Sequence, residues 1–282
     1  MQSEILVIGA TGKTGKRVVQ RLEAAGIPDR HGTRRSAIPF DWENPDIWAA
    51  SLAGIETAYV AYSPDLAIPS AHGVIAQFVE AIEKSGLKRI VLLSERNEAR
   101  AQACEQLVRD SSLEWTILQP SWFAQNFSEG GLLEGVLAGE VSVPASGAGE
   151  PFVDLEDVAD VAFAALTRDG HAGKTYEMTG PELLTWDEAV AHVARASGLD
   201  VSFRACTPQE FASTLVAACY PDEDAELVAT LVSQFLDGKN ATLADGVQQA
   251  LGRAPRNFTD FCKDAKAQGC WTAASPAVES GS

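Results

Sequence analysis

A glycine-rich turn near the N-terminus is the strongest candidate for chemistry in this sequence. Residues 9–15 read GATGKTG, follow a short apolar segment and open a helical pattern, which is the setting of a dinucleotide-binding fingerprint. Gly9 permits a tight turn, Gly12 lets a pyrophosphate approach the backbone, and Gly15 lets the helix pack close to a sheet. The turn is not a P-loop, because Val7 stands where that motif requires glycine. The residues expected to bind the dinucleotide here are Gly9, Thr11, Gly12, Lys13, Thr14 and Gly15.

Two arginines after the expected second strand bear on the choice of dinucleotide. An NAD site usually carries an acidic residue there, which bonds the ribose 2′-hydroxyl. Here the position holds Arg34 and Arg35, whose guanidinium groups can clamp a 2′-phosphate. The hydroxyls of the flanking Thr33 and Ser36 can add hydrogen bonds. The pattern favours NADP(H) over NAD(H), and the alternative interpretation is an exposed basic loop.

A short aromatic motif, Phe40-Asp41-Trp42, is expected to border the adenine of the dinucleotide. Asp41 can accept a hydrogen bond from the adenine amine, and Trp42 can pack nearby. A capping aspartate beside a core aromatic residue explains the motif equally well. The sequence leaves both interpretations open.

The proton-transfer pair of ordinary short-chain dehydrogenases is missing. In those enzymes a Tyr-x-x-x-Lys pair is used, in which the lysine depresses the pKa of the tyrosine. Ser94 follows the apolar segment 89–93, where a catalytic serine stands, although it can equally cap the next segment. The positions four residues after the four tyrosines hold Ser63, Leu66, Gly180 and Asp224.

The first half of the chain alternates apolar strands with amphipathic helices. Short links between them predict an α/β fold, a Rossmann-type doubly wound parallel sheet with right-handed crossovers. Residues 29–33 (DRHGT) lack an apolar core, and we place a strand there only because the spacing demands one. The expected strands are residues 4–8, 29–33, 57–61, 89–93 and 115–118, and the expected helices are residues 12–25, 74–85 and 98–109.

The second half predicts a smaller, mostly helical C-terminal lobe. Thr185 with Glu188 three residues later forms a capping box at the start of one helix. The expected helices are residues 130–139, 157–165, 185–197, 208–218, 222–237 and 257–268, with a strand at 174–179. We expect residues 1–150 to form the NADP-binding core, its sheet completed by part of 151–180, residues 151–271 to form the substrate-binding lobe, and residues 272–282 to be a disordered tail.

Composition and charge exclude several functions. The formal net charge of −17 opposes binding to nucleic acid and to anionic membranes, and no apolar run approaches the length of a membrane helix. The five cysteines are odd in number and include no C-x-x-C, which predicts reduced thiols and a cytoplasmic protein. The four histidines lack ligand spacing, so no metal site is predicted.

Several longer stretches resemble a known family. GATGKTG, FDW at 40–42, VLLS at 91–94, PSWFAQNF at 120–127 and GPELLT at 180–185 resemble the NmrA-like atypical short-chain dehydrogenases/reductases. Within that family the chain is most similar to the branch of the ergot-alkaloid reductases, and the resemblance spans nearly the whole chain. It departs at Gln119, where the family has arginine, and at Ala101, where many members have lysine.

The resemblance implies NADP(H)-dependent reduction of a bulky polycyclic specialised metabolite at an iminium or ketone carbon. An iminium already carries the charge that attracts hydride, whereas a ketone leaves an alkoxide that must be protonated or stabilised. The resemblance also implies a pocket beyond the strand ends, with Ala61 and Tyr62 beneath the nicotinamide. The implied catalytic candidates are Ser94, Tyr62 and Asn126, of which Ser94 and Tyr62 also contact the cofactor, and the implied substrate-lining residues are Glu95, Trp122, Phe123 and Phe127.

Other functions remain open at this point. A ketoreductase of an aromatic polyketide antibiotic pathway is one alternative, and a non-catalytic NADP(H)-binding redox sensor of the NmrA type is another. A quinone-reducing or isoflavone-reductase-type enzyme ranks lower, because Ala101 replaces the lysine of that class. The expected partner is a small polycyclic molecule, with no nucleic acid and no membrane, and the chain is expected to be a monomer or a homodimer.

Overall fold

The structure is a computed structural model that describes residues 4–272 of the 282-residue chain. The described residues form two units that interleave along the sequence. Unit 1 comprises residues 4–123, 151–183 and 239–256, and unit 2 comprises residues 124–150, 184–238 and 257–272. The tail expected at 272–282 lies outside the described residues, except for Thr272.

Unit 1 is built on a six-stranded parallel sheet with the order β2-β1-β3-β4-β5-β7. The doubly wound architecture is therefore confirmed, and β7 from the second half completes the sheet as expected. The strand β2 is the predicted 29–33 strand, shortened by one residue. The strands are β1 (Ile5–Ile8), β2 (Asp29–Gly32), β3 (Thr57–Ala61), β4 (Arg89–Leu93), β5 (Glu114–Pro120) and β7 (Lys174–Met178).

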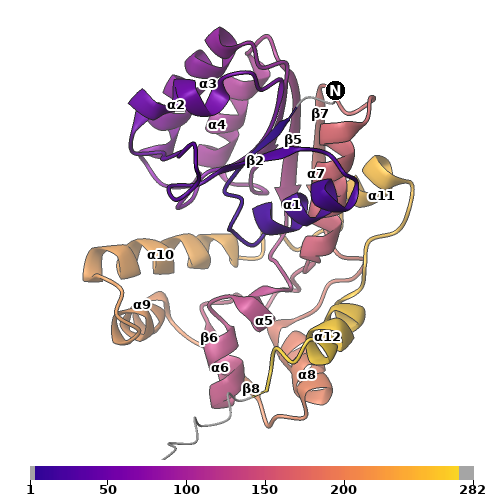
Figure 1. The fold of residues 1–282 in the computed structure, drawn as a ribbon. Helices are drawn as coiled ribbons and strands as arrows, with labels where there is room; N and C mark the ends of the chain where they lie inside the picture. The colour runs from indigo at the N-terminus through magenta and orange to yellow at the C-terminus, as the bar shows by residue number, and fades with distance from the viewer. Residues whose placement is uncertain (1–3, 273–282) are drawn as a thin grey trace, which may run out of the picture. The chain divides into compact units, whose positions relative to one another are not determined.

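Helices cover both faces of this sheet, as Figure 1 shows. Alternate strand residues point to opposite faces, so Leu6 and Ile8 join one hydrophobic core while Ile5 and Val7 join the other. The first core lies under α2 (Trp48–Leu52), α3 (Ala71–Ser85) and α4 (Ala99–Arg109), with the 3₁₀ turn η1 (Pro45–Ile47) before α2. The second lies under α1 (Gly15–Ala24), α7 (Leu155–Thr167) and α11 (Gly246–Leu251).

The strand β2 tolerates a polar sequence because it is an edge of the sheet. Arg30 donates to the Glu4 carboxylate, and the two groups approach to 2.5 Å. The same guanidinium donates to the carbonyl oxygens of Ser51 and Ala53, at 2.9 and 3.0 Å. Side-chain hydrogen bonds thus hold this strand in place of apolar packing.

The helix α1 is fixed to α7 by ion pairs. Arg17 contacts Glu156 at 2.6 Å, and Arg21 contacts Asp160 at 2.6 Å. Burial opposes the charge on these two carboxylates, but their hydrogen bonds to the arginines outweigh it and lower the pKa of each. The helix that follows the glycine turn therefore has a rigid support.

Helices predominate in the C-terminal region, as predicted, but unit 2 also contains a two-stranded parallel sheet that the sequence analysis did not predict. The sheet pairs β6 (Glu140–Val143) with β8 (Ser202–Ala205), and the second of these is largely exposed. The predicted capping box at Thr185 is present. The helices are α5 (Asn126–Glu129), α6 (Leu133–Ala138), α8 (Trp186–Ser197), α9 (Pro208–Ala217), α10 (Asp222–Phe235) and α12 (Phe258–Ala267). Across residues 4–272, no helix combines the length and apolar character that crossing a membrane requires.

Candidate functional site

The Gly9–Gly15 turn joins β1 to α1 and is shaped by close backbone packing. Gly9 has a φ of 81°, a left-handed conformation that a side chain would strain. A Cβ added to Gly15 would lie 2.1 Å from the Gly9 carbonyl oxygen, so the helix can start here only without a side chain. Thr11 and Gly12 are exposed on the turn. The turn therefore offers an accessible backbone at a helix N-terminus, which fits a dinucleotide pyrophosphate.

The turn lies where the strand order of the sheet reverses. β1 pairs with β2 on one side and with β3 on the other. A Cβ on Gly9 would lie 3.2 Å from the Cβ of Ala61, the last residue of β3, and the Gly9 amide donates to the Gly32 carbonyl at 3.1 Å. Open α/β sheets bind ligands at the carboxyl ends of the strands at such a switch point. The ends of three strands thus meet at the predicted dinucleotide site.

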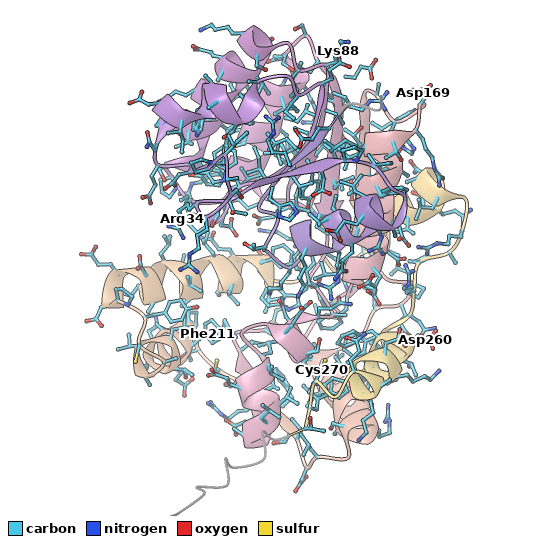
Figure 2. The ribbon with its side chains drawn as sticks, in the orientation of Figure 1. Arg34, Lys88, Asp169, Phe211, Asp260 and Cys270 are labelled. Atoms are coloured by element: carbon cyan, nitrogen blue, oxygen red, sulfur yellow. The ribbon has the colours of Figure 1, made fainter. Side chains whose placement is uncertain are left out.

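Arg34 and Arg35 lie in the turn that leaves β2, and both are exposed. The hydroxyls of Thr33 and Ser36 bond to each other at 2.7 Å and close this turn. Within residues 4–272, neither arginine takes part in an ion pair. Figure 2 shows the Arg34 side chain extending from the turn. Two unpaired positive charges therefore stand at the end of the edge strand, and their contact with a 2′-phosphate stays a prediction.

An aromatic cluster surrounds the residues predicted to border the adenine. Trp42 packs with its ring centroid 5.0 Å from that of Tyr62. The Asp41 carbonyl accepts a hydrogen bond from Trp48 Nε1 at 2.7 Å. Core packing therefore explains these positions in part, and a contact with adenine stays a prediction. The rings of the cluster belong to Phe40, Trp42, Trp48, Tyr62 and Phe78.

Ser94 lies at the carboxyl end of β4 and is buried. Its hydroxyl donates to Glu105 Oε1 at 2.5 Å. Glu105 is fully buried and also accepts from Gln119 Nε2 at 2.7 Å and from Arg109 at 2.8 Å. Gln119, which replaces the family's arginine, is thus one of three donors to this carboxylate.

Tyr62 is the second catalytic candidate and follows the end of β3. Burial raises the pKa of its phenol above the usual value, and a hydrogen bond to Ser70 opposes that effect. The partly buried Glu95 follows Ser94, and burial raises the pKa of its carboxyl, with the nearby Asp65 acting in the same direction. The structure thus places Tyr62, Ser94 and Glu95 at the same edge of the unit 1 sheet.

The aromatic segment after β5 is divided between the two units. Trp122 and Phe123 belong to unit 1, where Phe123 packs partly against the second core. Asn126 begins α5 of unit 2. Phe127 is fully buried in unit 2, and the centroid of its ring lies 5.7 Å from the ring centroid of Trp186. Packing accounts for Phe127, and the substrate contacts of these four residues stay predictions.

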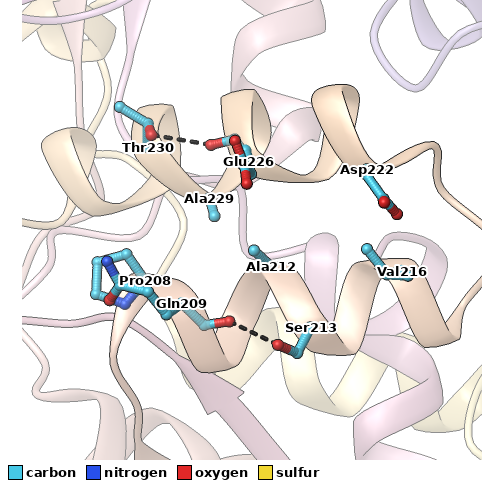
Figure 3. A pocket seen from close by; sticks show the side chains of 9 residues that line it. All are labelled: Pro208, Gln209, Ala212, Ser213, Val216, Asp222, Glu226, Ala229 and Thr230. Atoms are coloured by element: carbon cyan, nitrogen blue, oxygen red, sulfur yellow. Dashed lines mark hydrogen bonds between the residues drawn. The ribbon is translucent and has the colours of Figure 1, made fainter.

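Unit 2 also contains a hollow of about 700 Å³ between α9 and α10. Figure 3 shows the two helices on either side of it, with Ala212 and Ser213 from α9 and Glu226 and Ala229 from α10. None of the residues predicted from the sequence to bind cofactor or substrate lines this hollow.

The sequence analysis missed four charged residues near the strand ends. Glu105 and Arg96 are buried despite their charge, and Asp65 and Lys239 act electrostatically on Glu95. For Arg96, the available signal is a charged residue that closely follows an apolar strand. The partners of these residues lie far along the chain, and no local pattern indicates them.

Comparisons with known proteins agree with this geometry. A family described as NAD(P)H-binding matches residues 9–169, more than half of the chain and including the whole glycine turn. The chain belongs to this NAD(P)H-binding family. It is 30% identical to agroclavine dehydrogenase of Claviceps fusiformis, over 93% of this chain and 97% of that protein. The predicted resemblance to the ergot-alkaloid reductases is therefore confirmed.

Two solved structures share the fold of this family member. Triphenylmethane reductase of Citrobacter sp., complexed with NADP(H), has a TM-score of 0.75 at 22% identity and covers 93% of this chain and 99% of its own. NmrA, a negative transcriptional regulator solved with NAD, has a TM-score of 0.68 at 14% identity, covering 95% and 98%. The NmrA-like fold is thus confirmed, and it is shared by a reductase and a regulator.

Proposed function

We propose that this protein is an NADPH-dependent reductase that transfers hydride to an iminium or ketone carbon of a bulky polycyclic specialised metabolite. The observation that carries the proposal is the glycine turn at the β1/β3 switch point, with the exposed Arg34 and Arg35 beside it after β2. A bound NADPH supplies the hydride from its nicotinamide ring. We place the reaction in the cytoplasm, in keeping with five free thiols.

Different residues of the chain bind different groups of the cofactor. The backbone of the turn at Thr11 and Gly12 holds the pyrophosphate at the N-terminus of α1. Arg34 and Arg35 bind the 2′-phosphate, because each is exposed and has no competing ion pair within residues 4–272. Ala61 supports the turn from the end of β3. This division makes NADP(H) the preferred cofactor.

The substrate class rests on similarity. Agroclavine dehydrogenase is similar along almost its full length, and triphenylmethane reductase has the same fold. Both are named for bulky compounds with several rings. A ketone of an aromatic polyketide has the same bulk and is the alternative substrate. Trp122 and Phe123, both partly exposed in unit 1, supply aromatic surface for either substrate.

A non-catalytic sensor is the second candidate function. The chain lacks the Tyr-x-x-x-Lys pair, and the Ser94 proton is directed to Glu105. NmrA, which shares the fold, is a regulator. Such a protein binds the dinucleotide but does not catalyse hydride transfer to a substrate.

Turnover separates the two functions. We would follow NADPH consumption with two bicyclic probes of equal size, the ketone β-tetralone and the iminium N-methyl dihydroisoquinolinium. The reductase function predicts consumption of NADPH matched by reduced product for at least one probe. Binding of NADPH without turnover of either probe would contradict it and favour the sensor. The surface variant Lys84→Ala, at an exposed position of α3, is the control and should behave as the wild type.

A further inference from the structure

Two carboxylates and an imidazole gather at the amino end of β2, on unit 1. Asp29 and His31 are two residues apart in this strand, so their side chains leave the same face. Glu23 reaches them from the last turn of α1. One donor atom from each residue lies within 4.8 Å of those of the other two. The sequence predicts no metal site because its histidines lack ligand spacing, but the fold brings these three side chains together.

The turn between α1 and β2 holds the three residues in place. Gly26 has a φ of 68° and ends the helix, and its amide donates to the Glu23 carbonyl oxygen at 3.0 Å. The Ile27 amide donates to the Leu22 carbonyl oxygen at 2.9 Å. The Pro28 carbonyl oxygen accepts from the Ile5 amide at 3.0 Å, which fixes the start of β2 to β1. Glu23 is therefore held against the start of the strand.

The Asp29 carboxylate is buried without the donors that a buried carboxylate needs. Its side chain is only 10% exposed. Within residues 4–272, its Oδ2 atom is buried and accepts no hydrogen bond. This oxygen lies 2.8 Å from Nε2 of His31, but the contact lacks the geometry of a hydrogen bond. Burying a carboxylate oxygen without a donor is costly, so Asp29 points to a positive partner that binds between the two side chains.

No lysine or arginine in the described part of the chain neutralises this cluster. Arg21, the basic residue in the last turn of α1, is already paired with Asp160 at 2.6 Å. Arg30 donates to Glu4 and to backbone carbonyl oxygens. Glu23 has no ion pair within residues 4–272, and its negative charge at a helix C-terminus is unfavourable. The cluster therefore has an unbalanced negative charge.

The charges that act on Asp29 agree with this description. Burial is the largest influence and raises the pKa of Asp29, and His31 opposes it. Glu23 and Glu4 act in the same direction as burial. A divalent cation would reverse this balance by stabilising both carboxylates.

The spacing of the donor atoms suits a single small ion. Zn²⁺ binds imidazole nitrogen and carboxylate oxygen at about 2.0–2.2 Å, which places adjacent ligand atoms about 3 Å apart. The Asp29 and His31 atoms already have this spacing, at 2.8 Å. Glu23 is exposed and has no ion pair within residues 4–272, so its side chain is free to move closer. An imidazole ligand favours zinc and similar transition metals, whereas Mg²⁺ and Ca²⁺ prefer oxygen ligands alone.

We propose that Glu23, Asp29 and His31 bind a divalent transition-metal ion, of which Zn²⁺ is the representative, at the amino end of β2. The bound ion links the last turn of α1 to the edge strand, and water completes its coordination. The glycine turn lies at the opposite, carboxyl ends of the strands. The metal site is therefore separate from the proposed reaction and does not depend on it.

Calorimetric titration with zinc chloride tests the three ligands. His31→Ala and Glu23→Gln change exposed side chains and should fold normally, which circular dichroism checks. Each should weaken Zn²⁺ binding at this site by at least about tenfold, since even residues that only support a ligand contribute about 10–100-fold. His72→Ala and Glu80→Gln, at exposed positions of α3, are the matched controls and should bind Zn²⁺ as wild type does. Binding that is equally strong in His31→Ala and Glu23→Gln, or no binding by wild type, would overturn the proposal.

Two further readouts distinguish this site from other sites on the chain. The five cysteines are free and can also bind zinc, but Co²⁺ bound to thiolate gives an intense near-ultraviolet charge-transfer band. Co²⁺ at the site lost in His31→Ala should lack this band. Zn²⁺ should raise the Tm of wild type, and this rise should be absent in Asp29→Asn. A thiolate band from that site, an equal rise in Asp29→Asn, or binding of Mg²⁺ as tight as that of Zn²⁺ would overturn the proposal.

Discussion

The Ser94 hydroxyl donates to the Glu105 carboxylate over 2.5 Å, linking the end of β4 to α4. Glu105 is fully buried, and its charge is compensated by Arg109 and by the amide of Gln119. A buried carboxylate needs all of these donors, because the loss of any one donor leaves part of its negative charge without a partner. The hydroxyl of Ser94 is thus used to hold the end of β4 against α4.

Ser94→Ala is expected to lower stability more than catalysis. Removing one donor from buried Glu105 should cost about 1–3 kcal/mol of the free energy of unfolding, measured by urea denaturation. Ser213→Ala removes an exposed hydroxyl that bonds its own helix, and should change stability by less than about 0.5 kcal/mol. If Ser94→Ala abolishes turnover while stability is unchanged, Ser94 is a catalytic residue.

Gly15→Ala is expected to abolish dinucleotide binding. The new Cβ would lie 2.1 Å from the Gly9 carbonyl oxygen, so the turn or the start of α1 must move. Gly73→Ala is the matched control, since its helical position in α3 has nothing within 4 Å of the added Cβ. The control should be neutral or stabilise by up to about 1 kcal/mol. Calorimetric titration with NADPH tests both, and normal binding by Gly15→Ala would contradict the assigned role of the turn.

Asp157→Asn is expected to destabilise unit 1. The Asp157 side chain is fully buried and contacts Arg253 at 2.7 Å and also Arg256. Both arginines are over a third exposed, so we expect a loss of about 1–3 kcal/mol, below the full cost of breaking a buried pair. Glu56→Gln breaks an exposed pair with Lys88 and should cost less than about 1 kcal/mol. Equal losses in the two variants would show that burial does not set the effect.

Glu95→Gln is expected to change how stability depends on pH. The pKa of Glu95 is raised in the folded state, mainly by burial, so the folded protein keeps a proton that the unfolded chain releases above its ordinary pKa. Wild-type stability therefore falls as pH rises from the unfolded pKa toward the folded one. Relative to wild type, Glu95→Gln should gain more than about 1 kcal/mol between about pH 5 and about pH 8. A difference that stays flat across this range would contradict the raised pKa.

Local patterns were sufficient to predict the framework of unit 1. The GATGKTG turn, the apolar strands and the helix periodicity all depend on nearby residues, and the structure has them where expected. Even β2 followed from spacing, although its stability comes from Arg30 and its contacts with Glu4 and Ser51. Those contacts join residues more than twenty positions apart, so no local pattern shows them.

The details of the site depend on contacts that a local pattern does not contain. Ser94 is recognisable at a strand end, but its bond to Glu105 depends on how α4 packs. Arg96 is a charged residue after a strand, and only the fold shows that it is buried against residues 240–242. The strands β6 and β8 were missed because β8 is short and mostly exposed, and pairing across the sequence defines them.

The most direct test of the NADP(H)-dependent reductase is a titration of wild type and of the Arg34→Ala/Arg35→Ala double variant with NADPH, NADP+, NADH and NAD+. The two exposed arginines have no ion pair within residues 4–272 and should give wild type a clear preference for NADPH over NADH and for NADP+ over NAD+. Charged hydrogen bonds to a phosphate are worth about 1.5–3 kcal/mol each, so the double variant should bind NADPH at least about tenfold more weakly and NADH unchanged. Equal binding of all four dinucleotides by wild type, or a preference for the oxidised forms, would contradict the account and favour the sensor.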